Sequence, residues 1–104
     1  MIKTISPQDL HELLSSPNSE YDYIDVRSPA EYEDFHLPGT INIPLDQLVE
    51  NVGELGQDKT LITICAKGIR SAKASEFLLA IGFDTLNLEG GLDNWLSAGM
   101  QIPK

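Results

Sequence analysis

The sequence predicts a three-layered α/β fold, in which a mainly parallel sheet of about five strands is covered by helices on both faces. Short runs of β-branched and aromatic residues alternate along the chain with segments whose apolar residues recur at helical spacing. The most apolar run, Leu61–Ile64, is typical of a strand that is buried on both faces, as strands of parallel sheets are. Alternating strands and helices of this kind favour a parallel sheet.

The first half of the chain predicts three strands and two capped helices, with a third helical segment after them. Residues 2–5, 21–26 and 41–43 have the composition of strands. Ser6 and Ser28 each precede a proline and mark helix starts, because serine caps helices and proline favours the first helical position. We expect the first helix to end at Ser16–Asn18 and the second near Phe35. Apolar residues then recur at helical spacing over 45–52, before a turn at 53–59.

The second half predicts two strands and two helices. After the strand Leu61–Ile64, apolar residues at helical spacing predict a helix over Ser71–Ile81, which Gly82 ends. A strand over Phe83–Leu88, a glycine turn and a helix over Leu92–Ala98 complete the chain. No repeat or linker divides the 104 residues, so we expect residues 1–104 to form one domain.

The composition excludes several classes of function. A net charge of −9 disfavours general binding to nucleic acid or to anionic membranes. No apolar run approaches the ~20 residues that span a bilayer, and the first residues lack the apolar stretch of a signal peptide. One cysteine, Cys65, excludes an internal disulfide and a multi-cysteine metal site. We therefore expect a cytoplasmic protein.

The positive charge is unevenly distributed, and Cys65 lies where it gathers. From Lys59 to Ser75 there are four basic residues and no acidic one. This cluster is either a chance group on a solvated helix face or part of a functional site. Within it, Cys65–Ser71 runs from the carboxyl end of the apolar strand to the start of the next helix, where ligands bind in open α/β sheets.

The loop from Cys65 to Arg70 has the features of an anion-binding cradle. Inward backbone N–H groups, the helix start and the side chains of Lys67 and Arg70 all favour an anion, and Gly68 is free to adopt a positive φ. The same groups favour the thiolate form of a cysteine, which is its nucleophilic form. The alternative interpretation is a buried cysteine that merely ends a strand.

Four segments in order resemble the rhodanese family of sulfurtransferases, over nearly the whole chain. They are Asp25–Tyr32, His36–Pro44, Cys65–Ser71, and Glu89–Gly91 together with Trp95. The resemblance implies the rhodanese-like fold and a reaction in which the Cys65 thiolate takes a sulfane sulfur from a donor such as thiosulfate. The resulting persulfide would pass its sulfur to cyanide or a thiol, and neither a metal nor an organic cofactor is implied.

The resemblance also implies the residues of the site. Cys65 would be catalytic, and the substrate-binding loop would comprise Ala66, Lys67, Gly68, Ile69, Arg70 and Ser71. Lys67 and Arg70 would orient an anionic donor, while the Ser71 hydroxyl would either donate a further hydrogen bond or, as we expect, cap the helix. Ala66 departs from thiosulfate-using members that carry arginine there, which leaves the preferred donor open. Four residues separate Cys65 from Arg70, whereas the related phosphatases have five.

Three other functions remain open at this stage: a persulfide relay to a protein partner, a non-catalytic scaffold, and a phosphatase. Outside the loop, we expect Asp25 and Arg27 to be structural, through partners such as Glu31. His36 is expected to pack within its loop, and Trp95 to lie in the core or at its rim.

Overall fold

The computed structural model describes residues 2–16 and 20–102, and its centre is a five-stranded sheet in the order β1-β5-β4-β2-β3. All four strand pairings are parallel, so the α/β prediction is confirmed. The strands are β1 (Thr4–Ile5), β2 (Tyr21–Asp25), β3 (Ile41–Asn42), β4 (Thr60–Ile64) and β5 (Asp84–Leu88).

Helices and short 3₁₀ turns connect the strands. They are α1 (Pro7–Ser15), α2 (Pro29–Asp34), η1 (Leu45–Gln47), α3 (Leu48–Asn51), η2 (Val52–Glu54), α4 (Ile69–Ala80) and α5 (Gly91–Ser97). Ser6 and Ser28 cap α1 and α2 as predicted, and Ser28 forms a capping box with Glu31. The predicted helix over 45–52 is instead three short segments. The expected end of the first helix is partly seen, with Ser16 as C-cap, while residues 17 and 18 lie outside the described part.

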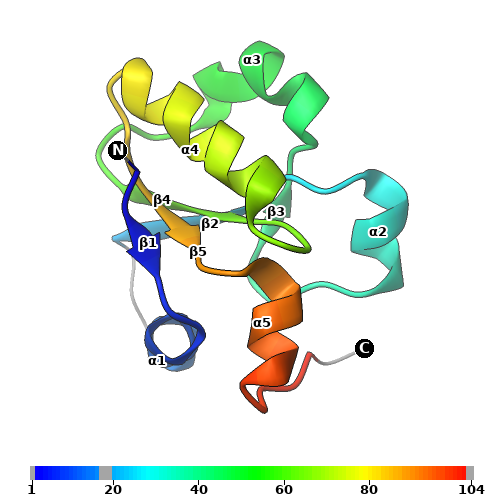
Figure 1. The fold of residues 1–104 in the computed structure, drawn as a ribbon. Helices are drawn as coiled ribbons and strands as arrows, with labels where there is room; N and C mark the ends of the chain where they lie inside the picture. The colour runs from blue at the N-terminus through cyan, green and yellow to red at the C-terminus, as the bar shows by residue number, and fades with distance from the viewer. Residues whose placement is uncertain (1, 17–19, 103–104) are drawn as a thin grey trace.

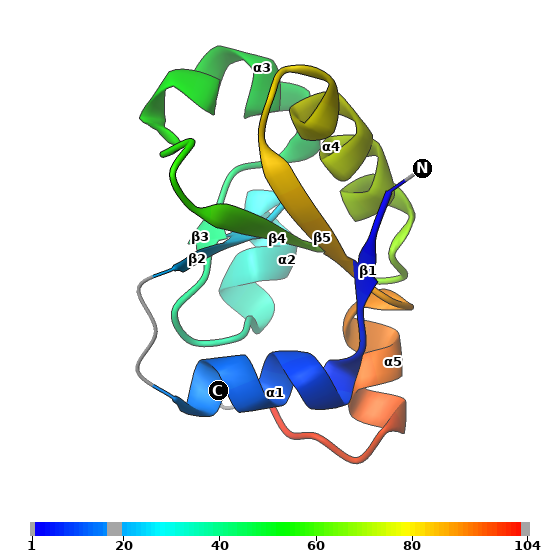
Figure 2. The same cartoon turned by 90° about the vertical axis from the view of Figure 1, so that its left-hand side faces the viewer.

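The helices form two layers on either side of the sheet. Helices α3 and α4 lie on one face and α1 and α5 on the other, as both views of the ribbon show (Figures 1 and 2). In β4, Leu61 belongs to the core under α4, whereas Ile62 and Ile64 belong to the core under α1 and α5. This explains why β4 carries apolar side chains on both sides, since both of its faces are buried.

The topology places Cys65 at the middle of one edge of the sheet. Because every pairing is parallel, all the strands end at that same edge, and β4 lies between β2 and β5. Cys65 follows the last residue of β4 directly, so segments that follow β2 and β5 flank it on either side. Within the described residues, no helix has the length and hydropathy needed to cross a membrane.

Candidate active site

Cys65 lies at the bottom of a hollow of about 340 Å³ at the carboxyl end of β4. The hollow is lined by Glu31, Cys65, Ala66, Lys67, Ile69 and Arg70. Only 1% of the Cys65 surface is exposed, so the thiol lies almost wholly beneath the surface of the protein. Four of the six predicted loop residues therefore line the hollow, and the other two, Gly68 and Ser71, contact the sulfur itself.

Three polar groups converge on the Cys65 sulfur. The backbone N–H of Gly68 donates to Sγ at 3.1 Å and that of Ser71 at 3.3 Å, while the Ser71 Oγ lies 3.2 Å from Sγ. Donors aimed at one atom favour negative charge on it, because hydrogen bonds to a charged acceptor are stronger than those to a neutral one. The arrangement therefore suits a thiolate.

Helix α4 begins earlier than predicted, and Ser71 has a different role from the expected one. Gly68 is the N-cap residue, with a φ of +89°, and no side chain caps the helix. A glycine takes this left-handed conformation without strain. Ser71 consequently lies inside the first turn, where its otherwise unpaired helix-start N–H points at the sulfur. The expectation that its hydroxyl caps the helix is therefore wrong, and the contact of the hydroxyl with Sγ agrees with the alternative, a further hydrogen bond.

The loop directs its amides inward because other elements bind its carbonyl groups from outside. The first residues of α5 donate backbone hydrogen bonds to it, from Leu92 to the Cys65 oxygen and from Asp93 to the Ala66 oxygen, each at 2.9 Å. From β5, the Asn87 Nδ2 donates to the Gly68 oxygen at 3.2 Å. These outer bonds fix the carbonyls of Cys65, Ala66 and Gly68, while the Gly68 N–H points inward to the Cys65 sulfur.

Gly91 makes the close approach of α5 possible. A Cβ atom at this position would lie 2.5 Å from the Ala66 carbonyl carbon and oxygen, well inside contact distance. Any side chain here would therefore push α5 away from the loop. The pattern Glu89–Gly91 was recognised in the sequence, but its role in bringing α5 against the loop was not. The contribution of Asn87 was not predicted. The two consecutive glycines that follow β5, Gly90 and Gly91, were the sequence signal for this close approach.

The buried hydroxyl of Thr63, beneath the loop, fixes the end of the loop at Ser71. The Thr63 Oγ1 donates to the Ser71 backbone oxygen at 3.0 Å and lies 2.8 Å from the Ser75 Oγ, and all three residues are fully buried. Thr63 lies in β4, on the face that packs under α4. The loop is thus fixed to the sheet at its middle, through Asn87 at Gly68, and at its far end, through Thr63 at Ser71.

Arg70 reaches across the hollow to a carboxylate from α2. Its Nη1 and Nη2 donate to the Oε1 and Oε2 of Glu31 at 2.7 and 2.9 Å. The Arg70 hydrogen bond, helped by Ser28, lowers the pKa of Glu31 to about 2, and the same bond raises the pKa of Arg70. Glu31 was expected to partner Asp25 or Arg27 instead, and that expectation is wrong, because Glu31 faces the hollow.

Asp25 and Arg27 form a buried ion pair beside the site, which agrees with their expected structural role, although the sequence did not predict the contact between them. The Arg27 Nη2 lies 2.8 Å from the Asp25 Oδ2 and also donates to the Phe35 backbone oxygen at 2.7 Å. The pair ties the end of β2 to the end of α2 through Phe35. Its function is to position the chain.

His36 and Trp95 also have packing roles. The His36 ring stacks on Tyr32 with ring centroids 3.8 Å apart, and its Nδ1 bonds the Tyr32 backbone oxygen. Trp95 is 2% exposed and belongs to the core under α1 and α5. Both observations agree with the predictions made from the sequence. Among the described residues, no group of three or more His, Cys, Asp or Glu side chains is arranged to hold a metal ion.

A model of the rhodanese-like domain family matches residues 6–98. The chain belongs to the rhodanese family. It is 31% identical over 104 residues to the mitochondrial thiosulfate sulfurtransferase RDL2 of Saccharomyces cerevisiae, a match that covers 86% of this chain and 70% of that protein. It is 34% identical over 94 residues to the putative sulfurtransferase YtwF of Bacillus subtilis, which covers 90% of each.

A solved structure supports the same family fold. The rhodanese-related protein from Thermoplasma volcanium superposes with a TM-score of 0.87 at 36% identity, over 97% of both chains. The rhodanese domain also occurs within a longer relative. This chain spans 24% of the probable adenylyltransferase/sulfurtransferase MoeZ of Mycobacterium tuberculosis, with 37% identity over 95 residues, which cover 88% of this chain. Family membership implies a sulfur donor and a sulfur acceptor as substrates.

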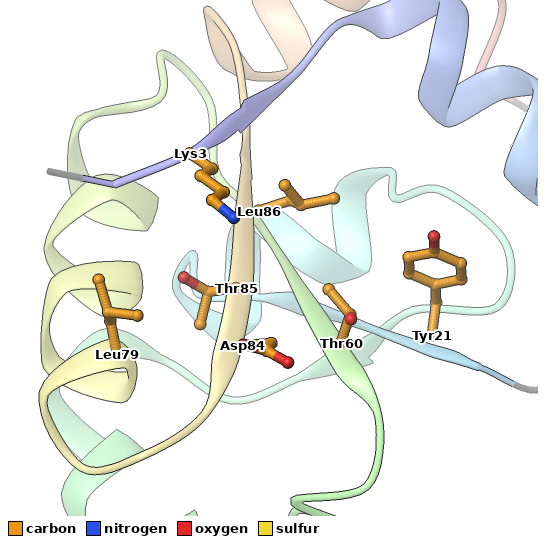
Figure 3. A pocket seen from close by; sticks show the side chains of 7 residues that line it. All are labelled: Lys3, Tyr21, Thr60, Leu79, Asp84, Thr85 and Leu86. Carbon is orange, nitrogen blue, oxygen red and sulfur yellow. The ribbon is translucent and has the colours of Figure 1, made fainter.

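A second hollow lies at the opposite end of the rhodanese sheet (Figure 3). Tyr21, Thr60 and Asp84, the first residues of β2, β4 and β5, line this space of about 300 Å³. It is therefore at the amino ends of the strands, whereas ligands of open α/β sheets bind at the carboxyl ends. The hollow at Cys65 remains the candidate active site.

Proposed function

We propose that this rhodanese transfers a sulfane sulfur through a persulfide on Cys65. The convergence of two backbone N–H groups and the Ser71 hydroxyl on Sγ carries the proposal, because it favours the nucleophilic thiolate. Residues 1–104 act as one domain, which agrees with the family match over residues 6–98 and with two core layers that share one sheet.

The reaction consists of two half-reactions. The Cys65 thiolate attacks the outer sulfur of thiosulfate, so that a bond to Sγ forms, the bond between the two thiosulfate sulfurs breaks, and sulfite leaves with the electron pair. An acceptor such as cyanide then attacks the terminal sulfur of the persulfide and leaves as thiocyanate, which restores the thiolate. Backbone N–H groups of residues 66–70 hold the terminal sulfur, and Lys67 attracts the anionic donor.

Intact-protein mass spectrometry tests this function directly. After incubation with thiosulfate, the wild type should gain the mass of one sulfur atom and lose it again with cyanide, with release of thiocyanate. Cys65→Ser should gain nothing and should unfold at the same urea concentration as the wild type, since the hydroxyl fits the same site. Sulfur gain by this variant would contradict the assignment of Cys65.

The outcome with other donors and acceptors refines the function. A gain with an organic persulfide alone would keep the chemistry and change the donor. Sulfur loading without turnover of cyanide or small thiols would assign a relay role toward a protein acceptor. No gain with any donor would mean that the domain is a scaffold.

A further inference from the structure

Glu31 lines the hollow at Cys65 although it lies 39 residues before its ion-pair partner Arg70. Both of its oxygens accept hydrogen bonds from the Arg70 guanidinium. This bidentate geometry restricts the orientation of an arginine side chain. The backbone N–H and the hydroxyl of Ser28 also donate to the Glu31 Oε1, each at 3.1 Å. The carboxylate is therefore held in place from α2, and it holds Arg70 with it.

This ion pair changes the charge that a substrate meets. Two cations and one anion line the hollow: Lys67, Arg70 and Glu31. Glu31 offsets Arg70 at contact distance, whereas the exposed Lys67 has no ion-pair partner among residues 2–16 and 20–102. The charged side chains around the Cys65 thiolate therefore contribute a net charge close to +1, which complements one negative charge better than two.

The rest of the lining is apolar. Ala66 and Ile69 complete the hollow, and 65% of the Ile69 surface is exposed beside the opening. Small-molecule sites typically combine apolar walls with a few placed charges. Ile69 thus offers a contact for an organic group that an inorganic dianion does not use.

We propose that Glu31 is a specificity-determining residue, which by holding Arg70 makes the site favour organic sulfur donors of single negative charge over thiosulfate. The proposal rests on the proposed function, because it concerns which donor loads Cys65. With a thiosulfonate donor, R–SO₂–S⁻, the thiolate attacks the terminal sulfur and a new S–S bond forms. The bond to the sulfonyl sulfur breaks, and the sulfinate R–SO₂⁻ leaves with the electron pair.

Two donors that differ by one charge test the proposal. Methanethiosulfonate and thiosulfate deliver sulfur by the same step, so the change in the ratio of their kcat/KM values between wild type and variant isolates the effect of charge. Glu31→Gln removes the negative charge at nearly constant size. Glu33→Gln is the matched control, since Glu33 is exposed on the same helix and its loss changes the net charge equally.

Glu31→Gln should raise kcat/KM about ten-fold for thiosulfate and about three-fold for methanethiosulfonate, because the electrostatic energy scales with the ligand's charge. The gain should come through KM and shrink at high salt, which screens charges near the surface. Glu33→Gln should change the ratio between the donors less than about two-fold.

Failure of this proposal and failure of the proposed function would give different results. If Glu31→Gln leaves the donor ratio unchanged, or lowers both values equally, Glu31 only positions the loop and the proposal is overturned. If wild-type Cys65 gains no sulfur from either donor, the proposed function itself fails.

Discussion

Two arginine–carboxylate ion pairs lie near the candidate site. Their N···O distances are nearly equal, but one pair is buried and the other is partly exposed to solvent. The Asp25–Arg27 contact is 2.8 Å long, and its side chains are 1% and 2% exposed. The Glu31–Arg70 contact is 2.7 Å long, and its side chains are 36% and 39% exposed. The chemistry of the two contacts is alike, but the buried pair is shielded from water and the other is not.

The difference in burial means that one ion pair stabilises the fold, whereas the other can be altered without unfolding the protein. Breaking a buried pair leaves a charge without water or partner, which is strongly destabilising. An exposed pair exchanges its partner for water at little cost, and salt weakens it. Asp25 and Arg27 therefore fix the backbone between β2 and α2, whereas Glu31 and Arg70 can alter the charge of the site while the fold stays intact.

The largest effect is expected from breaking the buried pair. Arg27→Met should lower the free energy of unfolding by about 3–5 kcal/mol, because Asp25 would stay buried without its partner. Arg70→Met is the matched control and should cost less than about 1 kcal/mol. Urea denaturation at neutral pH measures both values, and similar losses in the two variants would remove the distinction between the pairs.

A smaller effect is expected from the polar contact between β5 and the loop. Asn87→Ala should lower the free energy of unfolding by about 1 kcal/mol, because the Gly68 carbonyl loses one of its two donors and keeps only the backbone N–H of Ala72. It should also slow sulfur loading of Cys65, since the Gly68 N–H is no longer held toward Sγ.

Asn94→Ala provides the control for this prediction. Asn94 bonds the Glu89 carbonyl from an exposed position on α5, so its loss should leave the loading rate unchanged. Urea denaturation and timed mass spectrometry report the two quantities separately. Equal loading rates for Asn87→Ala and the wild type would show that the loop needs no support from β5.

The smallest effect concerns the pH dependence of the exposed pair. The pKa of Glu31 is lowered from 4.5 to about 2, first by the Arg70 hydrogen bond. A lowered pKa means that the contribution to stability is complete above 4.5 and is lost as the pH falls toward about 2. The small difference in unfolding free energy between wild type and Glu31→Gln should shrink across that interval. A difference that stays constant would mean that the carboxylate is not stabilised by Arg70.

Features that lie within one segment of sequence were predictable, and contacts between distant segments were not. The strand Leu61–Ile64 and the loop that follows it were recognised because hydrophobic runs and Gly68 are local signals. Ser71 was misassigned because capping rules favour hydroxyl side chains, whereas Gly68 begins α4 by backbone conformation alone. The roles of Glu31 and Asn87 depend on contacts with residues 39 and 19 positions away, which no local pattern contains.

The hydrogen bonds from α5 and β5 to the loop carbonyls determine where a residue can be inserted into the loop. Leu92 and Asp93 donate to the carbonyls of Cys65 and Ala66, and Asn87 donates to that of Gly68, so three of the first four loop residues are bonded to α5 or β5. An inserted residue there would shift every one of these bonds out of register. Between Gly68 and Arg70 no such bond to α5 or β5 is present in the described structure. Redesign of this site toward larger tetrahedral anions should therefore insert the extra residue after Gly68, where the first turn of α4 would have to rearrange, and leave the segment before it untouched.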